Sequence, residues 1–261
     1  MKPESPASFD TNLPTPMESD EWQVRCDLAA LYRLIAHFRM TDFIYTHVSA
    51  RVPGSEHHFL INTYGVMFHE MTASDLVRVD LDGNIVGPHD STKHINRAGY
   101  TIHSAIHAAR EDLTCVIHTH TAAGIAVSAQ THGLLPISQH ALKFHGCLSY
   151  HDYEGFALDL DERVRLVANL GSKNTSMILR NHGLLVCGRS IPEAFVQLYA
   201  LERACQTQIA ALAGGSRLVI PAEQVCDRTA SQYNADPERR QTHARMAWTT
   251  ALRLVGNDHA Q

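Results

Sequence analysis

The stretch Cys115-Val116-Ile117-His118-Thr119-His120 decides how this chain folds and what it can bind. Its apolar residues predict a buried β-strand, and strand side chains alternate between two faces with period two. His118 and His120 therefore point the same way. Three imidazoles leave an open coordination position on a divalent metal, which is typical of a catalytic site. A third histidine would complete such a set.

The third histidine is His182, in the turn Arg180-Asn181-His182-Gly183 between two apolar runs. A neighbouring strand ending in this turn could bring His182 to the other two. The alternative is that some of the 18 histidines fall near one another by chance. The turn between two apolar runs favours the metal interpretation.

The composition indicates one large globular domain. The chain has 261 residues, of which 44% are hydrophobic and 19% charged, enough to bury a substantial core. The net charge of -5 and the absence of basic clusters argue against nucleic acid or an acidic membrane as a partner. We expect neither a secretory signal nor a membrane span. Six cysteines without a Cys-x-x-Cys pair indicate a reduced, cytoplasmic protein.

The chain divides into three predicted segments. Residues 1–18 carry four prolines and read as a flexible tail, residues 19–215 form the domain, and residues 216–261 form a C-terminal extension. After an irregular stretch to residue 235, Asp236-Pro237 opens a helix that packs on the domain or on a neighbouring subunit. The intermixed helices and strands predict an α/β fold with many antiparallel strand pairs.

The expected helices and strands follow from apolar periodicity and capping residues. Ser190-Ile191-Pro192-Glu193 is a capping box with an early proline, which makes the helix after it the clearest of all. We expect helices at about 20–40, 97–110, 122–130, 159–170, 190–213 and 236–255. We expect strands at about 45–52, 58–62, 76–79, 113–120, 134–138, 147–150, 176–179 and 184–186.

Several motifs in order resemble the class II aldolase/adducin family. They are Asp80-Leu81-Asp82-Gly83, His103-Ser104-Ala105-Ile106 with Arg110-Glu111-Asp112, Val116-Ile117-His118-Thr119-His120, and Arg180-Asn181-His182-Gly183-Leu184-Leu185. The resemblance runs from about residue 22 to 213. It implies a three-layer α/β/α sandwich around a mainly antiparallel sheet, commonly in a homotetramer with sites between subunits. It also implies that His118, His120 and His182 bind the metal.

The chain departs from the sugar-phosphate aldolases of that family in three places. Their Ser-Ser-Glu segment, whose glutamate is metal ligand and base, falls on Arg97-Ala98-Gly99. Their phosphate-binding Gly-Asn pair falls on Thr46-His47, and their Thr-x-Ser-Gly loop falls on Thr63-Tyr64-Gly65. A backbone nest needs small residues to approach a phosphate closely. We therefore expect a substrate without a phosphate group.

The sequence looks more like the adducin-type branch of the family. Ile61-Asn62-x-Tyr64-Gly65, Asn96-Arg97-Ala98-Gly99, Leu135-Pro136-Ile137-Ser138 and Tyr150-His151-Asp152-Tyr153-Glu154-Gly155 carry this resemblance. Eukaryotic adducins of that branch are cytoskeletal and have generally lost metal histidines. This chain keeps all three metal histidines, which disfavours a scaffold. Gly99, which replaces the family's glutamate, favours a scaffold.

Four residues are candidates for substrate binding. The planar guanidinium of Arg97 suits a carboxylate, which it can bind bidentately. His47, Tyr64 and Gly65 would line the same pocket, where the two rings could stack on a substrate ring or bond a hydroxyl. The alternative for Arg97 is a surface residue at a helix N-terminus.

With Gly99 in the glutamate position, another group must transfer the proton. His103, on the helix before the metal strand, is the first candidate, although His103 and His107 could serve packing alone. Tyr233 lies in the C-terminal region, which in relatives supplies a tyrosine acid across the subunit boundary. Lys143 lies where related epimerases place catalytic side chains, but a surface lysine is favoured there. His69 and Glu70 are favoured as a solvated loop edge.

Together these features predict a metal-dependent carbon–carbon lyase, an aldehyde-lyase or carboxy-lyase. Its metal would stabilise an enediolate from a small carboxylated or hydroxylated substrate by acting as a Lewis acid. Zn²⁺ is the expected ion, with Mn²⁺, Co²⁺ or Fe²⁺ as alternatives. The competing interpretations are a non-catalytic adducin-like scaffold and an epimerase or isomerase on the same metal.

Overall fold

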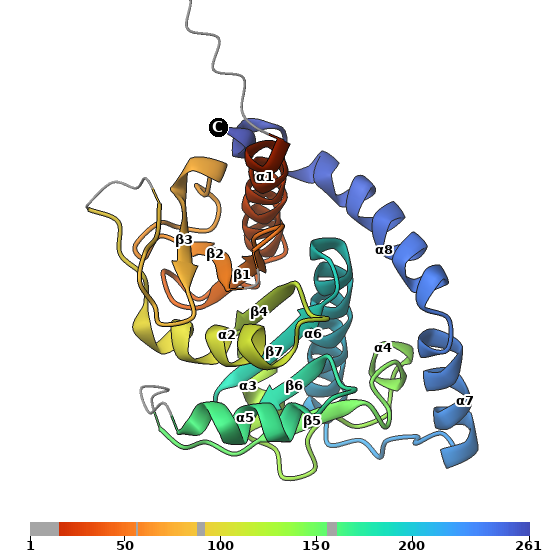
Figure 1. Cartoon of the computed structure of the whole chain (residues 1–261). Helices are drawn as coiled ribbons and strands as arrows, with labels where there is room; N and C mark the ends of the chain where they lie inside the picture. The colour runs from red at the N-terminus through yellow and green to blue at the C-terminus, as the bar shows by residue number, and fades with distance from the viewer. Residues whose placement is uncertain (1–15, 56, 88–91, 156–160) are drawn as a thin grey trace, which may run out of the picture.

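A seven-stranded sheet forms the centre of the protein (Figure 1). The computed structural model describes residues 16–55, 57–87, 92–155 and 161–261. The strand order is β3-β2-β1-β4-β7-β6-β5. The pairing of β5 with β6 is parallel, and the other pairs are antiparallel. The strands are β1 (His47–Arg51), β2 (His58–Asn62), β3 (Leu76–Asp80), β4 (Cys115–Thr119), β5 (Leu148–His151), β6 (Ser176–Leu179) and β7 (Gly183–Gly188).

Helices cover both faces of this sheet, so the predicted three-layer sandwich around a mainly antiparallel sheet is confirmed. The α-helices are α1 (Pro16–His37), α2 (Arg97–Ala109), α3 (Ala122–Ser128), α4 (Gln139–Leu142), α5 (Glu162–Leu170), α6 (Ile191–Ala213), α7 (Glu223–Asn234) and α8 (Pro237–Ala251). Helices α1, α3 and α6 pack on one face, and α2 and α5 pack together on the other.

The alternation of β4 explains why this strand is buried on both faces of the sheet. Cys115 and Ile117 are completely buried in the core that includes α1 and α6. Val116 points the other way and is completely buried with Ile106 of α2 and Leu166 of α5. Burying one such aliphatic side chain contributes about 1.5–3 kcal/mol, so both faces stabilise the sandwich. His118 follows the pattern and points to the α2 face.

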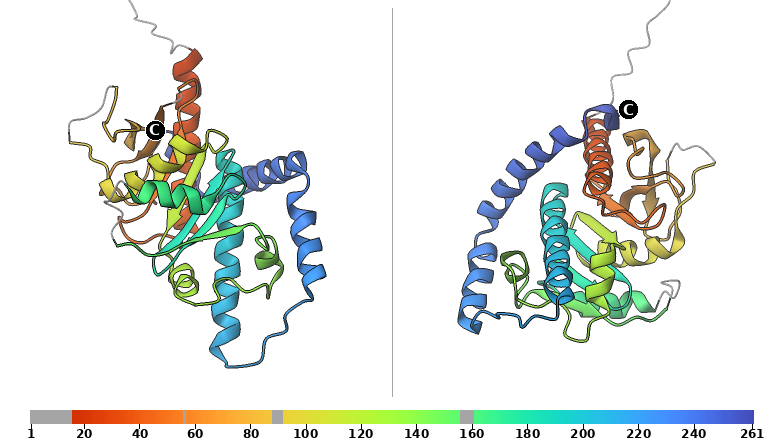
Figure 2. Two further views of the ribbon diagram at one scale, coloured as in Figure 1. Left: turned by 60° about the horizontal axis from the view of Figure 1, so that its bottom comes forward. Right: turned by 180° about the vertical axis from the view of Figure 1, so that it is seen from behind.

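Helices α7 and α8 form an arm along the outer side of α6 (Figure 2). The α8 helix begins where the sequence predicts, because the Asp236 side chain accepts a hydrogen bond from the Arg239 amide at 3.0 Å. Trp248 of α8 packs against Phe195 of α6 with ring centroids 5.8 Å apart. The predicted helix of the C-terminal extension thus packs on the domain of its own chain.

The structure differs from the local predictions in three places. Helix α1 begins at Pro16, inside the predicted tail, whose residues 1–15 lie outside the described residues. Residues 134–138 form no strand, since the Leu135 amide bonds Gln208 instead. Helix α7 occupies much of 216–235, with only Cys226 and Ala230 buried, too few to show a periodicity.

The short 3-10 turns are η1 (Ala73–Asp75), η2 (Leu252–Leu254) and η3 (Asp258–Ala260). The last of them contacts α1 and η1, so the final residues pack beside the first described helix. Within the described ranges, no helix has the length and apolar character needed to cross a membrane.

Candidate metal centre

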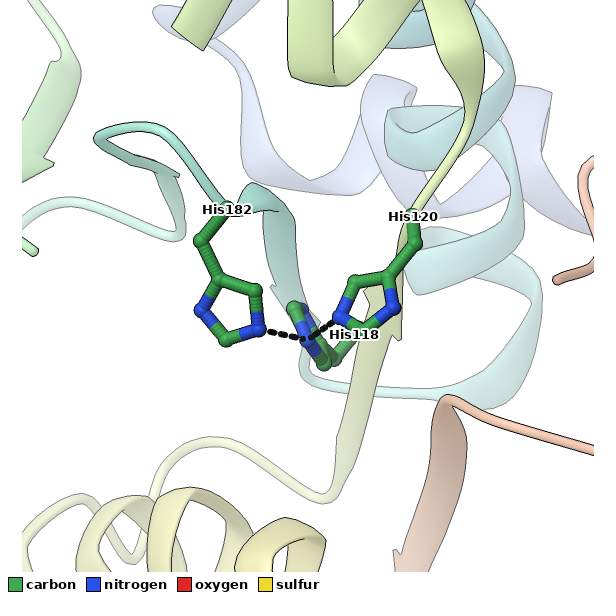
Figure 3. Close-up of side chains that lie close together, drawn as sticks. All are labelled: His118, His120 and His182. Atoms are coloured by element: carbon green, nitrogen blue, oxygen red, sulfur yellow. Dashed lines mark hydrogen bonds between the residues drawn. The ribbon is translucent and has the colours of Figure 1, made fainter. Parts of the chain in front are cut away.

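Three histidine side chains meet at the end of β4 (Figure 3). His118 is the fourth residue of β4, His120 follows the strand, and His182 lies in the turn between β6 and β7. The Nε2 atom of His118 lies 2.8 Å from Nε2 of His120 and 3.3 Å from Nε2 of His182. The structure therefore brings together the three residues that the sequence predicts as metal ligands.

The turn before β7 is shaped to bring His182 close to β4. Asn181 adopts a left-handed conformation, with φ of 55°, which asparagine tolerates better than most residues. A Cβ atom at Gly183 would collide with the carbonyl oxygen of Thr119. Glycine thus lets the turn approach the end of the neighbouring strand, and His182 is carried within reach of His118.

Two of the three outer nitrogens of the cluster face hydrogen-bond acceptors. Nδ1 of His118 lies 3.0 Å from the Leu184 carbonyl oxygen, and Nδ1 of His120 lies 3.1 Å from a carboxylate oxygen of Asp42. A neutral imidazole carries one proton, so these contacts place that proton on Nδ1. The Nε2 lone pairs then converge, which is unfavourable unless a cation lies between them. This donor set fits a divalent metal.

Burial lowers the pKa of two of the three histidines, which favours their neutral form. The pKa of His118 is held well below its ordinary value by burial, and the nearby histidines lower it further. Burial likewise lowers the pKa of His182 to about 4. Neutral imidazole is the form that binds metals, so at neutral pH His118 and His182 are ready to act as ligands.

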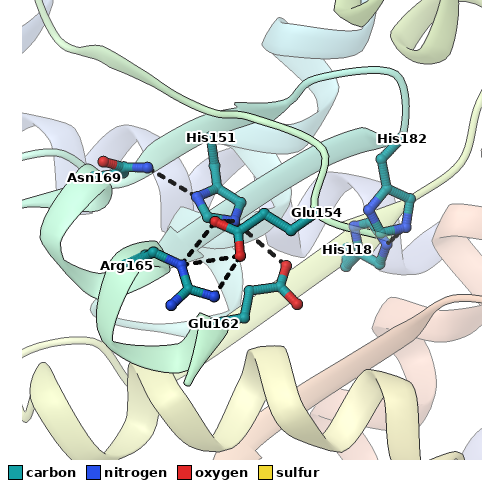
Figure 4. A network of polar contacts seen from close by, with 7 residues as sticks. All are labelled: His118, His151, Glu154, Glu162, Arg165, Asn169 and His182. Atoms are coloured by element: carbon teal, nitrogen blue, oxygen red, sulfur yellow. Dashed lines mark hydrogen bonds and ion pairs between the residues drawn. The ribbon is translucent and has the colours of Figure 1, made fainter. Parts of the chain in front are cut away.

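A polar network lies beside the His182 side of the cluster (Figure 4). Asn169 of α5 donates to Nδ1 of His151 at 2.8 Å, which leaves Nε2 of His151 to donate to the Glu162 carboxylate at 3.3 Å. Arg165 pairs with Glu154 in the same network. These bonds fix the end of β5 against α5. The Tyr153 ring of that segment lies 6.2 Å from the His182 ring.

A buried histidine layer, which we define as His47, His103 and His107, lies between β1 and α2 behind the cluster. The Ser49 hydroxyl joins two of its members, at 2.6 Å from Nδ1 of His103 and 2.8 Å from Nε2 of His107. His103 is 0% exposed. His103, the first candidate for proton transfer, thus lies behind the three clustered histidines. It cannot touch a substrate there unless the structure rearranges.

His47 is the member of this layer nearest the cluster. It pairs with His118 across β1 and β4, and the two rings are stacked with centroids 6.4 Å apart. The ring fills the space beside Gly99, because a Cβ atom there would collide with it. Burial, together with His120 and His182, lowers the pKa of His47 to about 3.

The other predicted substrate residues are less closely tied to the cluster. Tyr64 is 39% exposed, and its amide bonds the His94 carbonyl at 2.8 Å. Gly65 adopts a left-handed conformation in the same turn. No described hydrogen bond or ring contact joins these two to the three histidines. Arg97 begins α2, but its side chain lies outside the described residues.

Tyr233 and Lys143 lie in a cleft of 480 Å³ between α4, α6, α7 and α8. The Tyr233 hydroxyl accepts a hydrogen bond from the Gln139 amide at 3.0 Å. Burial lowers the pKa of Lys143 to about 8, so this lysine is not the free surface residue that the sequence favours. Helix α6 covers the sheet face opposite α2, so within one chain the cleft and His118 lie on opposite sides.

Two residues near the three clustered histidines are not among the site residues predicted from the sequence. Asp42 reaches His120 over 78 positions of sequence, and His151 belongs to the network beside His182. An isolated aspartate in a turn carries no spacing signal that could have pointed to it. His69 and Glu70 are exposed, as the solvated interpretation expects.

The chain belongs to the class II aldolase and adducin family. Residues 26–209 match the family described as Class II Aldolase and Adducin N-terminal domain. A Pseudomonas aeruginosa protein, named as an aldolase class 2 protein, is 48% identical over 249 residues, covering 95% of each chain. Alpha-adducin of Rattus norvegicus is 46% identical over 196 residues, which cover 75% of this chain and 26% of the adducin.

Solved structures share the fold over nearly the whole length. An aldolase II superfamily protein from Pseudomonas syringae has a TM-score of 0.87 at 53% identity, covering 95% of this chain and 98% of its own. An L-fuculose 1-phosphate aldolase from Glaciozyma antarctica has a TM-score of 0.82 at 26% identity, covering 98% and 97%. The resemblance predicted from the sequence motifs is confirmed.

Proposed function

We propose that this protein is a metal-dependent carbon–carbon lyase of the retro-aldol or decarboxylase type. The observation that carries the proposal is the convergence of three Nε2 atoms, with the Nδ1 atoms of His118 and His120 facing acceptors. His118, His120 and His182 would hold the divalent metal, for which we propose Zn²⁺. A metal bound there would polarise a substrate carbonyl and stabilise an enediolate as a Lewis acid.

The proposed substrate is a small carboxylated or hydroxylated molecule without a phosphate group. The family's phosphate-binding glycine falls on Thr46, which is completely buried. A threonine there fills space that a backbone nest would leave to a phosphate. Arg97, at the start of α2, is the residue proposed to bind a substrate carboxylate.

Tyr233 is the proposed proton donor, and it would protonate a substrate bound at the metal centre of a neighbouring copy of the chain. Two observations support this role. The residue lies in a cleft away from the histidines of its own chain, and its hydroxyl is held by Gln139. His103, being buried behind His47, is proposed to position other groups. The shared site implies a homo-oligomer, for which we propose a tetramer in the cytoplasm, where six free thiols are stable.

The competing proposal is an adducin-like scaffold, and the similarity to alpha-adducin supports it. Elemental analysis of the purified protein separates the two. We expect about one divalent metal per chain, and none in a His118→Ala/His120→Ala variant. A folded wild type that stays metal-free after incubation with zinc or manganese would contradict the lyase. Release of an aldehyde or carbon dioxide from keto and hydroxy acids would then distinguish lyase from epimerase.

A further inference from the structure

The cleft between α4, α6, α7 and α8 has a polar floor. Figure 1 shows α4 between α6 and the arm that α7 and α8 form. Glu193 and Gln197 of α6, each 7% exposed, are the deepest polar residues of its lining, and we call them the floor. The cleft measures 480 Å³, a volume typical of small-molecule sites in proteins. Polar groups at this depth need hydrogen-bond partners, and the protein supplies only some of them.

Two polar atoms of the cleft lining have no partner. The side-chain oxygen Oε1 of Gln197 is buried and accepts no hydrogen bond from the residues that the structure describes. The same part of the chain offers no acceptor to the buried Nε of Arg240, a lining residue from α8. An unsatisfied buried donor or acceptor costs folding free energy. A molecule in the cleft that carries both a hydroxyl donor and an acceptor oxygen would satisfy both atoms.

The cleft lining carries more positive than negative charge. Its cationic side chains are Lys143, directly after α4, with Arg239 and Arg240 of α8. Among the described residues the lining has one carboxylate, that of Glu193, which lies 3.9 Å from Arg240. Within the same ranges no hydrogen bond or ion pair holds the Lys143 ammonium, and its contact is with the Phe144 ring at 5.8 Å. Burial lowers the pKa of Lys143, so its surroundings do not fully compensate the charge.

We propose that this cleft binds a small hydroxylated carboxylic acid, with its carboxylate on Lys143 and Arg240 and its hydroxyl on Gln197. Ammonium and guanidinium groups both form charge-assisted hydrogen bonds with a carboxylate. A hydroxyl can donate to the amide oxygen of Gln197. Val196 and Ala244 give the lining an apolar part, which suits the carbon skeleton of such an acid. This site needs no metal, because none of its residues belongs to the three clustered histidines.

Malate and succinate are matched probes, because they differ only in the hydroxyl group that malate carries. We would measure their binding to the metal-free protein by calorimetry. We expect malate to bind, and to bind at least fivefold more tightly than succinate. Lys143→Gln, which removes the ammonium, should weaken the binding of both acids at least tenfold. Lys173→Gln, at an exposed lysine outside the cleft, is the matched control and should bind both acids as the wild type does.

Gln197→Leu tests the contact with the hydroxyl group. This variant should bind malate and succinate about equally, because the lost amide oxygen served malate alone. Its melting temperature without ligand should not be lowered, since that oxygen has no partner among the described residues. A much lower melting temperature would contradict the proposal, because the amide oxygen would then have a structural use. Should Gln197→Leu fail to fold, Gln197→Met gives the same test with an unbranched side chain.

The His118→Ala/His120→Ala variant separates this site from the metal centre. We expect it to bind malate as tightly as the wild type does. Malate binding that requires zinc, or that this variant loses, would overturn the proposal, because the acid would then be a ligand of the metal. Normal malate binding by Lys143→Gln, or no binding of malate by the wild type at millimolar concentrations, would overturn it as well. A wild type that binds malate but no zinc would support this site and overturn only the proposed function.

Discussion

The two faces of the central sheet differ sharply, although the same strands build both. Towards α1 and α6, strands β1 and β4 present Val48, Ala50, Cys115 and Ile117, all buried in one apolar core. Towards α2, the intervening residues His47, Ser49 and His118 are equally buried but polar. In this part of the sheet one face is wholly apolar, whereas the other carries buried imidazoles beside its own apolar cluster.

This difference shows how one fold can hold both a stable core and a cluster of buried imidazoles. Polar groups on the α2 face are tolerated because the opposite face supplies apolar burial on the same strands. The His118, His103 and His107 side chains find partners at Leu184 and Ser49, whereas His47 has none in the part of the chain that the structure describes. Changes on the first face should therefore act on folding alone, whereas changes at the three clustered histidines on the second face should act mainly on metal binding.

The largest expected effect comes from the apolar face. Ile117→Ala removes a completely buried side chain and should lower the unfolding free energy by about 2–5 kcal/mol, because the cavity cannot fully collapse. Zinc affinity of the folded fraction should stay within threefold. Urea denaturation and zinc titration measure the two quantities. His118→Ala, at the next residue, should instead lower zinc affinity more than it lowers the unfolding free energy. Equal losses of stability and of zinc affinity in both variants would contradict the difference between the two faces.

The second effect concerns pH and the buried histidine layer. Burial lowers the pKa of His107 to about 3 from 6.5, so the folded protein keeps this residue neutral. The unfolded chain takes up a proton below pH 6.5, whereas the folded chain does so only near 3. The stability that neutral His107 gives the folded protein is therefore fully present above pH 6.5. It is lost progressively as the pH falls from 6.5 towards 3. At pH 5 we expect a loss of about 2 kcal/mol from this residue.

Denaturation between pH 7 and pH 5 measures this loss. Burial also lowers the pKa of His103, which acts in the same direction. His107→Leu is the control. It should be less stable at pH 7, because Ser49 loses a partner, yet its stability should fall less steeply with pH. Parallel curves for the wild type and this variant would argue against a neutral His107.

The smallest effect concerns the contact between Asp42 and His120. A carboxylate on the outer nitrogen orients a metal-binding imidazole, and its loss typically costs at least tenfold in metal affinity. Asp42→Asn keeps the shape but removes the charge, so we expect about a tenfold weaker zinc affinity and an unchanged melting temperature of the metal-free protein. Competition with a chelator measures the affinity. A zinc affinity equal to that of the wild type would show that the Asp42 carboxylate does not contribute to zinc binding by the three histidines.

The sequence by itself determined the features that depend on neighbours along the chain. Period-two alternation places Ile117 and His118 on opposite faces, and the Asn181-His182-Gly183 turn presents the third histidine. Local capping starts α6 at Ser190 and α8 at Asp236. These features follow from dihedral preferences and short-range hydrogen bonds, which act within a few residues.

Only the tertiary structure decided which distant residues meet. Asp42 reaches His120, the His47 ring lies against Gly99, and α7 is stabilised on α4 without a periodic apolar pattern. Each contact joins segments whose separation in sequence says nothing about their separation in space. The free energy that holds such segments together comes from the packing of the whole domain, which no single stretch of sequence contains.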